Sequence, residues 1–365
     1  MKKLIFSGLF SFLTMLFITS CSKSDNGTGG GGTTVADTLR ITLSNSTVEF
    51  NGFDYTSITV KDKTGADVTS TSDIYANNNL ITNKFVPTGT GTFLITAKKG
   101  TIPSDSKVLN VIAASASPFS KKIIVEDVTG AWCGFCPRVA YSLENYKATK
   151  PNCIVIGVHG GGGTDPYKYQ YYTNLNTAFS VTGYPTAIVN RKFKWTESTT
   201  ELNSELSKYA PLGLAITSTT DGVNATGKVQ VKFNVNTDQP MKIVIALVEN
   251  GLVYPQVNYY SPSGGYTPYL YGGANPINNF VHNGVMRRAS TDIFGDVIPT
   301  TAQTKNNIWE LNYSIPLSGT TSSGTSFTAN SSNSAIVAFV MDGSTAQKGV
   351  YNAQTTNVGT NKNFD

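Results

Sequence analysis

The sequence predicts a multidomain chain in which a mixed α/β domain stands between two β-sandwich domains. Residues 38–113 contain short runs in which apolar and polar side chains alternate, as they do in strands that bury one face. Residues 119–210 change to continuous apolar runs followed by segments with helical spacing. Alternating runs return over residues 211–365, and a chain of 365 residues is long enough for two or three domains.

The N-terminus has the layout of an export signal. Residues 1–20 begin with Met-Lys-Lys and continue in an apolar stretch that is too short to span a bilayer. The junction at residues 17–21 resembles a bacterial lipobox, so Cys21 is predicted to carry lipid and to anchor the mature protein to a membrane. An ordinary signal peptide with a coincidental cysteine is the alternative. Residues 21–37 include four consecutive glycines and are predicted to form a flexible tether.

The charge balance argues against nucleic acid as a partner. The chain has 28 Lys and Arg against 23 Asp and Glu, and its net charge of +5 falls to +3 when Lys2 and Lys3 leave with the signal. A charge this small over this length makes no case for a nucleic-acid surface.

Residues 38–113 are predicted to fold as the first β-sandwich. Residues 60–69 resemble a segment of the immunoglobulin-like modules of bacterial surface proteins, and the domain has no cysteine for an inter-sheet disulfide. An immunoglobulin-like spacer is therefore expected. Its strands are expected at residues 39–43, 55–61, 72–76, 92–97 and 107–112.

The α/β domain is expected over residues 119–210, after a small and polar linker. Thr164 is a favourable helix start because Pro166 falls in the first turn. The strands are expected at residues 122–125, 154–158 and 186–189, and the helices at residues 137–147, from 164 towards 179, and 197–209.

Residues 132–137 read Trp-Cys-Gly-Phe-Cys-Pro and lie between a predicted strand and a predicted helix. At a helix N-terminus, unpaired amides and the macrodipole favour a thiolate, which makes Cys133 the expected nucleophile. Cys136, one turn further on, is the expected resolving thiol, and Trp132 offers a partner an apolar contact surface. A stable disulfide that only supports a binding scaffold is the alternative.

The remaining candidate residues do not complete a zinc site. Beyond the cysteine pair, the mature chain offers only Cys153, His159 and His282, without ligand spacing, so no metal or cofactor is expected. Cys153 begins a strand of roughly 20 Å and is expected to be a buried small hydrophobe at the far end. His159, at the near end, is a candidate general acid or base, with an ordinary loop histidine as the alternative.

Residues 211–365 are predicted to form a second β-sandwich, interrupted by an aromatic, Gly- and Pro-rich stretch at residues 254–281. Tyrosines on loops suit recognition, so this stretch is a candidate surface for a glycan or a protein ligand. The alternative is that the rings cover the edge of the sandwich. The tyrosines are Tyr254, Tyr259, Tyr260, Tyr266, Tyr269 and Tyr271. The strands are expected at residues 214–218, 228–235, 242–249, 308–315 and 335–341.

With residues 132–137 at one end and Gly-Tyr-Pro-Thr at residues 183–186, the α/β domain resembles a thioredoxin-fold domain. The resemblance implies that Pro185, beside Tyr184, is a cis-proline that hydrogen-bonds the backbone of a bound substrate. It also implies that Asp127 is a buried acid that helps to deprotonate the resolving thiol, and that the partners are protein thiols or disulfides. The Gly-Phe dipeptide departs from the common forms, so the redox potential is not implied.

Several segments together resemble the twenty-eight-kilodalton outer-membrane-protein family of Bacteroidetes lipoproteins. They are the lipobox and residues 126–137, 158–159, 183–186, 282–287 and 335–340. The family implies an outer-membrane lipoprotein in which a thioredoxin-like domain precedes a β domain, over about residues 119–365. We therefore expect thiol-disulfide exchange through Cys133 and Cys136 in the cell envelope. A surface adhesin with an inert disulfide is the alternative, and exposure of Cys133 separates the two, since a nucleophile needs an open sulfur beside Pro185.

Overall fold

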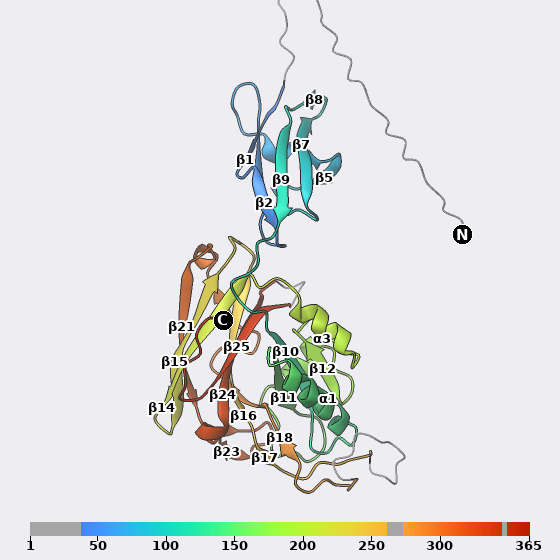
Figure 1. The fold of residues 1–365 in the computed structure, drawn as a ribbon, viewed down its shortest axis with the longest axis vertical. Helices are drawn as coiled ribbons and strands as arrows, with labels where there is room; N and C mark the ends of the chain where they lie inside the picture. The colour runs from blue at the N-terminus through green and yellow to red at the C-terminus, as the bar shows by residue number, and fades with distance from the viewer. Residues whose placement is uncertain (1–37, 261–272, 345–348) are drawn as a thin grey trace, which may run out of the picture.

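The N-terminal unit is a small β-sandwich. The computed structural model describes residues 38–260, 273–344 and 349–365, so the predicted signal, Cys21 and the tether lie outside these ranges. The strands are β1 Arg40–Leu43, β2 Thr47–Phe50, β3 Thr56–Lys61, β4 Asp73–Ala76, β5 Asn79–Ile81, β6 Lys84–Phe85, β7 Gly91–Lys99, β8 Ile102–Pro103 and β9 Lys107–Ala113. A sheet of order β1-β3-β6 packs on one of order β2-β9-β7-β4-β5, with β8 beside β7, at one end of the elongated molecule (Figure 1). The predicted strands are confirmed, and the likeness to immunoglobulin-like modules stays a prediction.

Strands and helices alternate over residues 119–210. The elements are β10 Ile123–Thr129, α1 Cys136–Thr149, β11 Cys153–His159, α2 Tyr172–Ala178, β12 Thr186–Val189, β13 Phe193–Lys194 and α3 Thr199–Leu206. β10 lies parallel to β11 and antiparallel to β12. Ile123 and Val125 of β10 join the core under α1 and α3, whereas Ile124 joins the core that contains α2. Because both faces of β10 are covered, its first three residues, 123–125, form a continuous apolar run.

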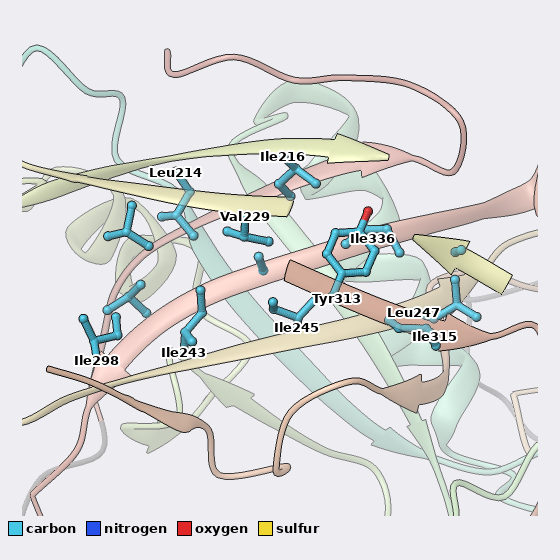
Figure 2. Packing of buried hydrophobic residues seen from close by; sticks show 14 of the residues in the cluster. Leu214, Ile216, Val229, Ile243, Ile245, Leu247, Ile298, Tyr313, Ile315 and Ile336 are labelled. Atoms are coloured by element: carbon cyan, nitrogen blue, oxygen red, sulfur yellow. The ribbon is translucent and has the colours of Figure 1, made fainter. Parts of the chain in front are cut away.

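The regular structure described in the C-terminal part of the chain is mainly β-strand. The strands are β14 Leu212–Thr220, β15 Asn224–Phe233, β16 Met241–Glu249, β17 Leu252–Val253, β18 Val281–His282, β19 Val285–Ala289, β20 Asp296–Ile298, β21 Ile308–Pro316, β22 Ser318–Thr320, β23 Ser326–Thr328, β24 Ser334–Asp342 and β25 Val350–Asn357. The sheet β14-β15-β21 packs against β16 and β24. Figure 2 shows the side chains of this core, among them Leu214, Ile245 and Tyr313, gathered between the two sheets.

One nine-stranded sheet crosses the predicted domain boundary at residue 210. Its order is β13-β12-β10-β11-β19-β16-β24-β25, with β20 beside β16. β19 lies parallel to β11 with Gly157 opposite Val285, and Gly157 N donates to Gly284 O at 2.8 Å. Gly284 has a φ of +62°, and a Cβ there would lie 2.5 Å from Val155 O, so this approach requires glycine. The two predicted domains therefore share a sheet.

Two helices differ from the prediction. The helix expected from Thr164 begins only at Tyr172, because the side chain of Asp165 is buried and bonded to backbone amides outside a helix. The last helix, expected over residues 197–209, is the shorter α3. Glu197 has a φ of +67°, which lies outside the right-handed helical region.

A buried ion pair joins the turn after β12 to β10 and to the C-terminal strands. The Arg191 guanidinium bonds both carboxylate oxygens of Glu126, with its shortest contact at 2.7 Å from Nη2 to Oε1. Its Nη1 donates to Ile293 O at 2.6 Å, and the cation lies 4.8 Å from the centre of the Phe339 ring. Both charged side chains are almost fully buried, so each depends on the other for compensation.

Within the described ranges, no helix has the length and apolar character needed to cross a membrane.

Replacing Arg191 with methionine should destabilise the body of the protein. Arg191→Met leaves the Glu126 carboxylate buried without its cation, which lowers the free energy of unfolding by about 3–5 kcal/mol. Urea unfolding followed by circular dichroism measures the effect, and Arg40→Met on an exposed strand position is the matched control. Equal midpoints for the two variants would contradict a structural role for the pair.

Candidate functional site

The cysteine pair lies in a tight turn between β10 and α1. Cys133 N donates to Gly130 O at 2.9 Å, and Cys136 N donates to Cys133 O at 3.2 Å. Cys133 and Cys136 form a disulfide with an S–S distance of 2.09 Å. The helix begins at Cys136, so Cys133 precedes the helix N-terminus by three residues instead of occupying its first turn.

Residues 254–260, between β17 and β18, cover this turn and are called the covering segment below. Four hydrogen bonds to the turn hold it there: Val257 N to Ala131 O at 2.8 Å, Tyr259 N to Gly134 O at 2.9 Å, and Gln256 Nε2 to Cys133 O at 2.8 Å and to Gly130 O at 3.2 Å. These bonds satisfy the turn's carbonyl groups in much the same way as an added strand would.

The ring of Tyr259 rests directly on the turn. A Cβ on Gly134 would lie 2.4 Å from this ring, so only glycine admits the contact. Phe135 meets Tyr259 and Tyr260 edge to face, with centroid distances of 5.1 and 5.7 Å. Cys133 is only 4% exposed, which corrects the expectation of an open sulfur beside Pro185.

A cavity of about 300 Å³ lies behind the disulfide, and Asp127, Cys136 and His159 are among the residues that line it. Asp127 is buried, and its Oδ1 has no hydrogen-bond partner among the described residues. Burial, followed by the charge of Glu197, raises the pKa of Asp127 to about 7. A buried carboxyl whose Oδ1 has no hydrogen-bond partner in the described part of the chain therefore shares a cavity with Cys136.

His159 and Asp165 form a buried pair at the end of β11. His159 Nδ1 lies 2.7 Å from Asp165 Oδ2, which also accepts from Ala131 N at 2.8 Å, and Asp165 Oδ1 accepts from Tyr167 N at 2.8 Å. Burial alone would raise the pKa of Asp165, but the hydrogen bond and charge of His159, with the two amides, outweigh it and lower this pKa. His159 is therefore not an ordinary loop histidine.

His282, which the sequence presented only as a possible metal ligand, packs against this pair. Its ring centroid lies 5.1 Å from that of His159, and its Nε2 lies 3.3 Å from Tyr254 O. Burial, followed by the charge of His159, lowers the pKa of His282 to about 4. Within the described ranges, no group of three or more His, Cys, Asp or Glu side chains is arranged to hold a metal ion.

Trp132 packs on Tyr184, the residue that precedes Pro185. The Tyr184–Pro185 peptide bond is cis, as the resemblance implied, and the rings of Trp132 and Tyr184 lie 5.2 Å apart. Trp132 Nε1 donates to Gly160 O at 2.9 Å. A Cβ on Gly163 would lie 2.2 Å from the indole, so glycine lets the ring lie on the backbone. The indole is half-buried, with part of its surface still open.

The described tyrosines of the aromatic stretch face the α/β part of the chain. Tyr260 is buried and accepts a hydrogen bond from Arg138 Nη1 at 2.8 Å, and Tyr254 packs on Tyr167. Tyr259 is half-exposed. Tyr266, Tyr269 and Tyr271 lie outside the described residues.

Sequence reasoning missed Asp165 and Gln256 as site residues, and it did not place residues 254–260 over the cysteine turn. Asp165 follows His159 by six residues, and a polar residue so close to a candidate histidine was a usable signal. Gln256 lies more than a hundred residues from the disulfide and carries no local signal at all. Cys153 is buried as expected, and burial raises the pKa of its thiol to about 12.

The family model of the outer membrane protein Omp28 matches residues 172–362, just over half of the chain. The chain belongs to the Omp28 outer-membrane-protein family. The expected location in the outer membrane is thereby confirmed. The Omp28 match begins at α2, so it includes the covering segment and the strands of the shared sheet from β12 onward, but not β10, β11 or the two cysteines.

Two solved structures resemble parts of this Omp28-family chain, and both come from Porphyromonas gingivalis. HBP35 has 17% identity, covering 67% of this chain and 77% of that chain with a TM-score of 0.49. A domain of the outer membrane lipoprotein Omp28 has 19% identity, covering 41% of this chain and 90% of that chain with a TM-score of 0.24. No curated protein matches this chain.

The Asp127 carboxyl should make stability depend on pH. Its pKa is about 7 in the folded chain against an ordinary 3.8, so the folded protein keeps a proton that the unfolded chain releases. The free energy of unfolding therefore falls as pH rises from about 4 to about 7, by on the order of 4 kcal/mol from this group.

Urea unfolding at pH 5 and pH 8 measures this effect. Asp127→Asn removes the titrating group, so its loss of stability between the two pH values should be smaller than that of the wild type. Asp73→Asn, at an exposed strand position, should behave as the wild type does. An unchanged pH dependence in Asp127→Asn would show that this carboxyl does not hold a proton in the folded chain.

Proposed function

We propose that this protein is an outer-membrane lipoprotein whose residues 119–210 form a thioredoxin-like domain that exchanges disulfides with envelope proteins. The observation that carries the proposal is Asp127, which is buried, lacks a hydrogen-bond partner on Oδ1 among the described residues, and lines a cavity with Cys136. An inert disulfide does not require a titratable acid beside it, whereas a resolving thiol requires a group that accepts its proton when it reacts and returns the proton when it leaves.

The order of the strands supports a thioredoxin-like domain. β10 precedes the cysteine turn and lies between the parallel β11 and the antiparallel β12, which follows the cis-proline. β13 extends the sheet beyond β12, and α1 and α3 pack on one face. β19 then lies parallel to β11, so the C-terminal part of the chain supplies the next strand of the sheet.

The proposed reaction starts from the disulfide. A substrate thiolate attacks the sulfur of Cys133, the Cys133–Cys136 bond breaks, and Cys136 leaves as a thiolate that takes a proton from Asp127. A second substrate thiolate attacks the substrate sulfur of the mixed disulfide, and Cys133 leaves as a thiolate. The substrate loses two electrons and becomes a disulfide, while this chain gains them as two reduced cysteines. The reverse sequence reduces a substrate disulfide.

The neighbouring side chains suit supporting roles in this reaction. His159, fixed by Asp165, lines the cavity and is a second candidate for moving protons. Trp132, Tyr184 and Pro185 leave a half-buried surface, which is a candidate platform for the substrate backbone.

The covering segment must move before a protein substrate can reach Cys133. Its hydrogen bonds to the turn involve backbone groups and Gln256, and the exposed ring of Tyr259 closes over Gly134. We therefore include opening of this segment as a step of the proposed reaction.

A second candidate function is a surface adhesin or accessory binding lipoprotein with an inert disulfide. The low exposure of Cys133 favours it, since a sealed sulfur meets no substrate. The half-exposed Tyr259 would then contribute to a surface for a glycan or protein ligand.

Trapping in cells tests the exchange reaction. In Cys136→Ala the free Cys133 thiolate can still attack a substrate disulfide, as in the reverse sequence, but the thiol that would release the substrate from the mixed disulfide is missing. Alkylation under non-reducing conditions should therefore capture covalent complexes with envelope proteins. Cys153→Ala, which removes only the buried thiol, should capture none and retain normal exchange. Absence of complexes in Cys136→Ala, with the chain folded and located in the outer membrane, would favour the adhesin.

Loosening the covering segment should speed up reduction of the disulfide. Tyr259→Ala removes an aromatic contact worth about 0.5–1.5 kcal/mol, so the open form becomes roughly two- to tenfold more populated. The rate of reduction by a small dithiol, quenched with an alkylating agent, reports this change. Tyr171→Ala, at another exposed tyrosine, is the matched control. Identical rates in both variants would show that the segment does not limit access.

A further inference from the structure

A second and larger cavity is lined by residues other than those around the disulfide. Its volume is about 1030 Å³, and it shares no lining residue with the cavity behind Cys136. It is lined by the tip of the N-terminal sandwich at residues 51–53, the turn and strand after β12, the end of α3, and the start of β25. Three parts of the fold therefore contribute to one hollow, which no step of the proposed exchange uses.

Lysines dominate the charge of this cavity. Lys121, Lys192, Lys194 and Lys208 line it, against the carboxylates of Glu205 and Asp342. Arg191 also lines the cavity, but its charge is neutralised by Glu126. The lining therefore keeps an excess of positive charge.

Two of these lysines gather around one buried carboxylate. Lys208 bonds Glu205 Oε1, and Lys192 Nζ lies 3.9 Å from the same oxygen, while Asn190 Nδ2 donates to Oε2 at 3.0 Å. The Lys208 side chain, followed by burial, lowers the pKa of Lys192, as expected for cations held close together. The side chains of Lys192 and Lys208 are 54% and 44% exposed, so a ligand can reach both.

Lys121 adds a third cation from a more enclosed position. Its Nζ donates to Val350 O at 3.1 Å and to Tyr351 O, which leaves one of its three donors for a ligand. Burial lowers the pKa of Lys121 to about 8, so the group still carries charge at neutral pH.

Half-buried aromatic rings complete the lining. They are Phe53, Phe179, Phe193, Tyr209 and Tyr351. The cavity is far larger than the roughly 30 Å³ that one water molecule occupies in the liquid, and its volume falls near the upper end of ordinary ligand sites. An inorganic anion alone would leave most of it, and all of its rings, unused.

We propose that this cavity binds an acidic oligosaccharide. Sulfate or carboxylate groups of the sugar meet the ammonium groups of Lys192 and Lys208, and the sugar rings pack on the aromatic side chains. Because the N-terminal sandwich contributes Phe53 to the lining, binding also engages the junction between this unit and the body. The proposal is independent of the disulfide chemistry.

Titration calorimetry on the mature chain tests the proposal. The probes are a heparin-derived tetrasaccharide, which carries sulfate, and a tetragalacturonate, which carries only carboxylate; the neutral cellotetraose and inorganic sulfate are the comparisons. At least one acidic tetrasaccharide should bind at a single site, at least about tenfold more tightly than either comparison, because each hydrogen bond to a charged group contributes to affinity.

The double variant Lys192→Gln and Lys208→Gln should weaken this binding at least about tenfold, while Lys150→Gln at an exposed position outside the cavity should leave it unchanged. Circular dichroism on each variant verifies that the chain is folded. Equal binding by the double variant would place the sugar elsewhere. Equal affinity for inorganic sulfate would reduce the site to a simple anion site, and absence of binding by both acidic probes would overturn the proposal.

Discussion

The backbone pairing between β11 and β19 is the constraint on which the rest of this structure depends. A glycine with positive φ, Gly284, brings the two strands together, and a single sheet then runs through both halves of the body. The chain between β16 and β19 has to pass over the end of the sheet at which β10 and β11 finish. The covering segment lies in this connection, so the topology of the sheet carries it to the cysteine turn.

The buried charges of the body differ in how well they are compensated. The Glu126 carboxylate accepts hydrogen bonds from two guanidinium nitrogens of Arg191. The Asp165 carboxylate contacts His159 Nδ1 and accepts from two backbone amides. Both arrangements are what a structural role requires, because a buried charge that lacks a partner is strongly destabilising. Asp127 differs from them. Its Oδ1 has no hydrogen-bond partner among the described residues, and burial raises its pKa to about 7, so the fold disfavours its charged form. Uncompensated burial of this kind is typical of groups retained for chemistry.

Much of the local structure could be predicted from the sequence, because it depends on local patterns. The apolar run at residues 123–125 predicts a strand covered on both faces, and the spacing of Val139 and Leu143 predicts α1. The long-range features could not be predicted in this way. The pairing of Gly157 with the strand at Val285, and the hydrogen bond from Gln256 to Cys133, join positions more than a hundred residues apart. Thr164 and Pro166 carry a valid helix-start pattern, but the tertiary bonds of Asp165 override it.

The shared sheet has a further consequence for β11. If the C-terminal strands detached, the outer edge of β11 would present unpaired amide and carbonyl groups on a largely apolar strand, a template to which strands of other molecules add readily. In the intact chain, β19 pairs with this edge at Gly157, near the C-terminal end of β11, and the sheet ends instead at the two-residue β13 and at β25. The attachment of the C-terminal strands therefore protects β11 from pairing with strands of other molecules, which would lead to aggregation in the crowded cell envelope.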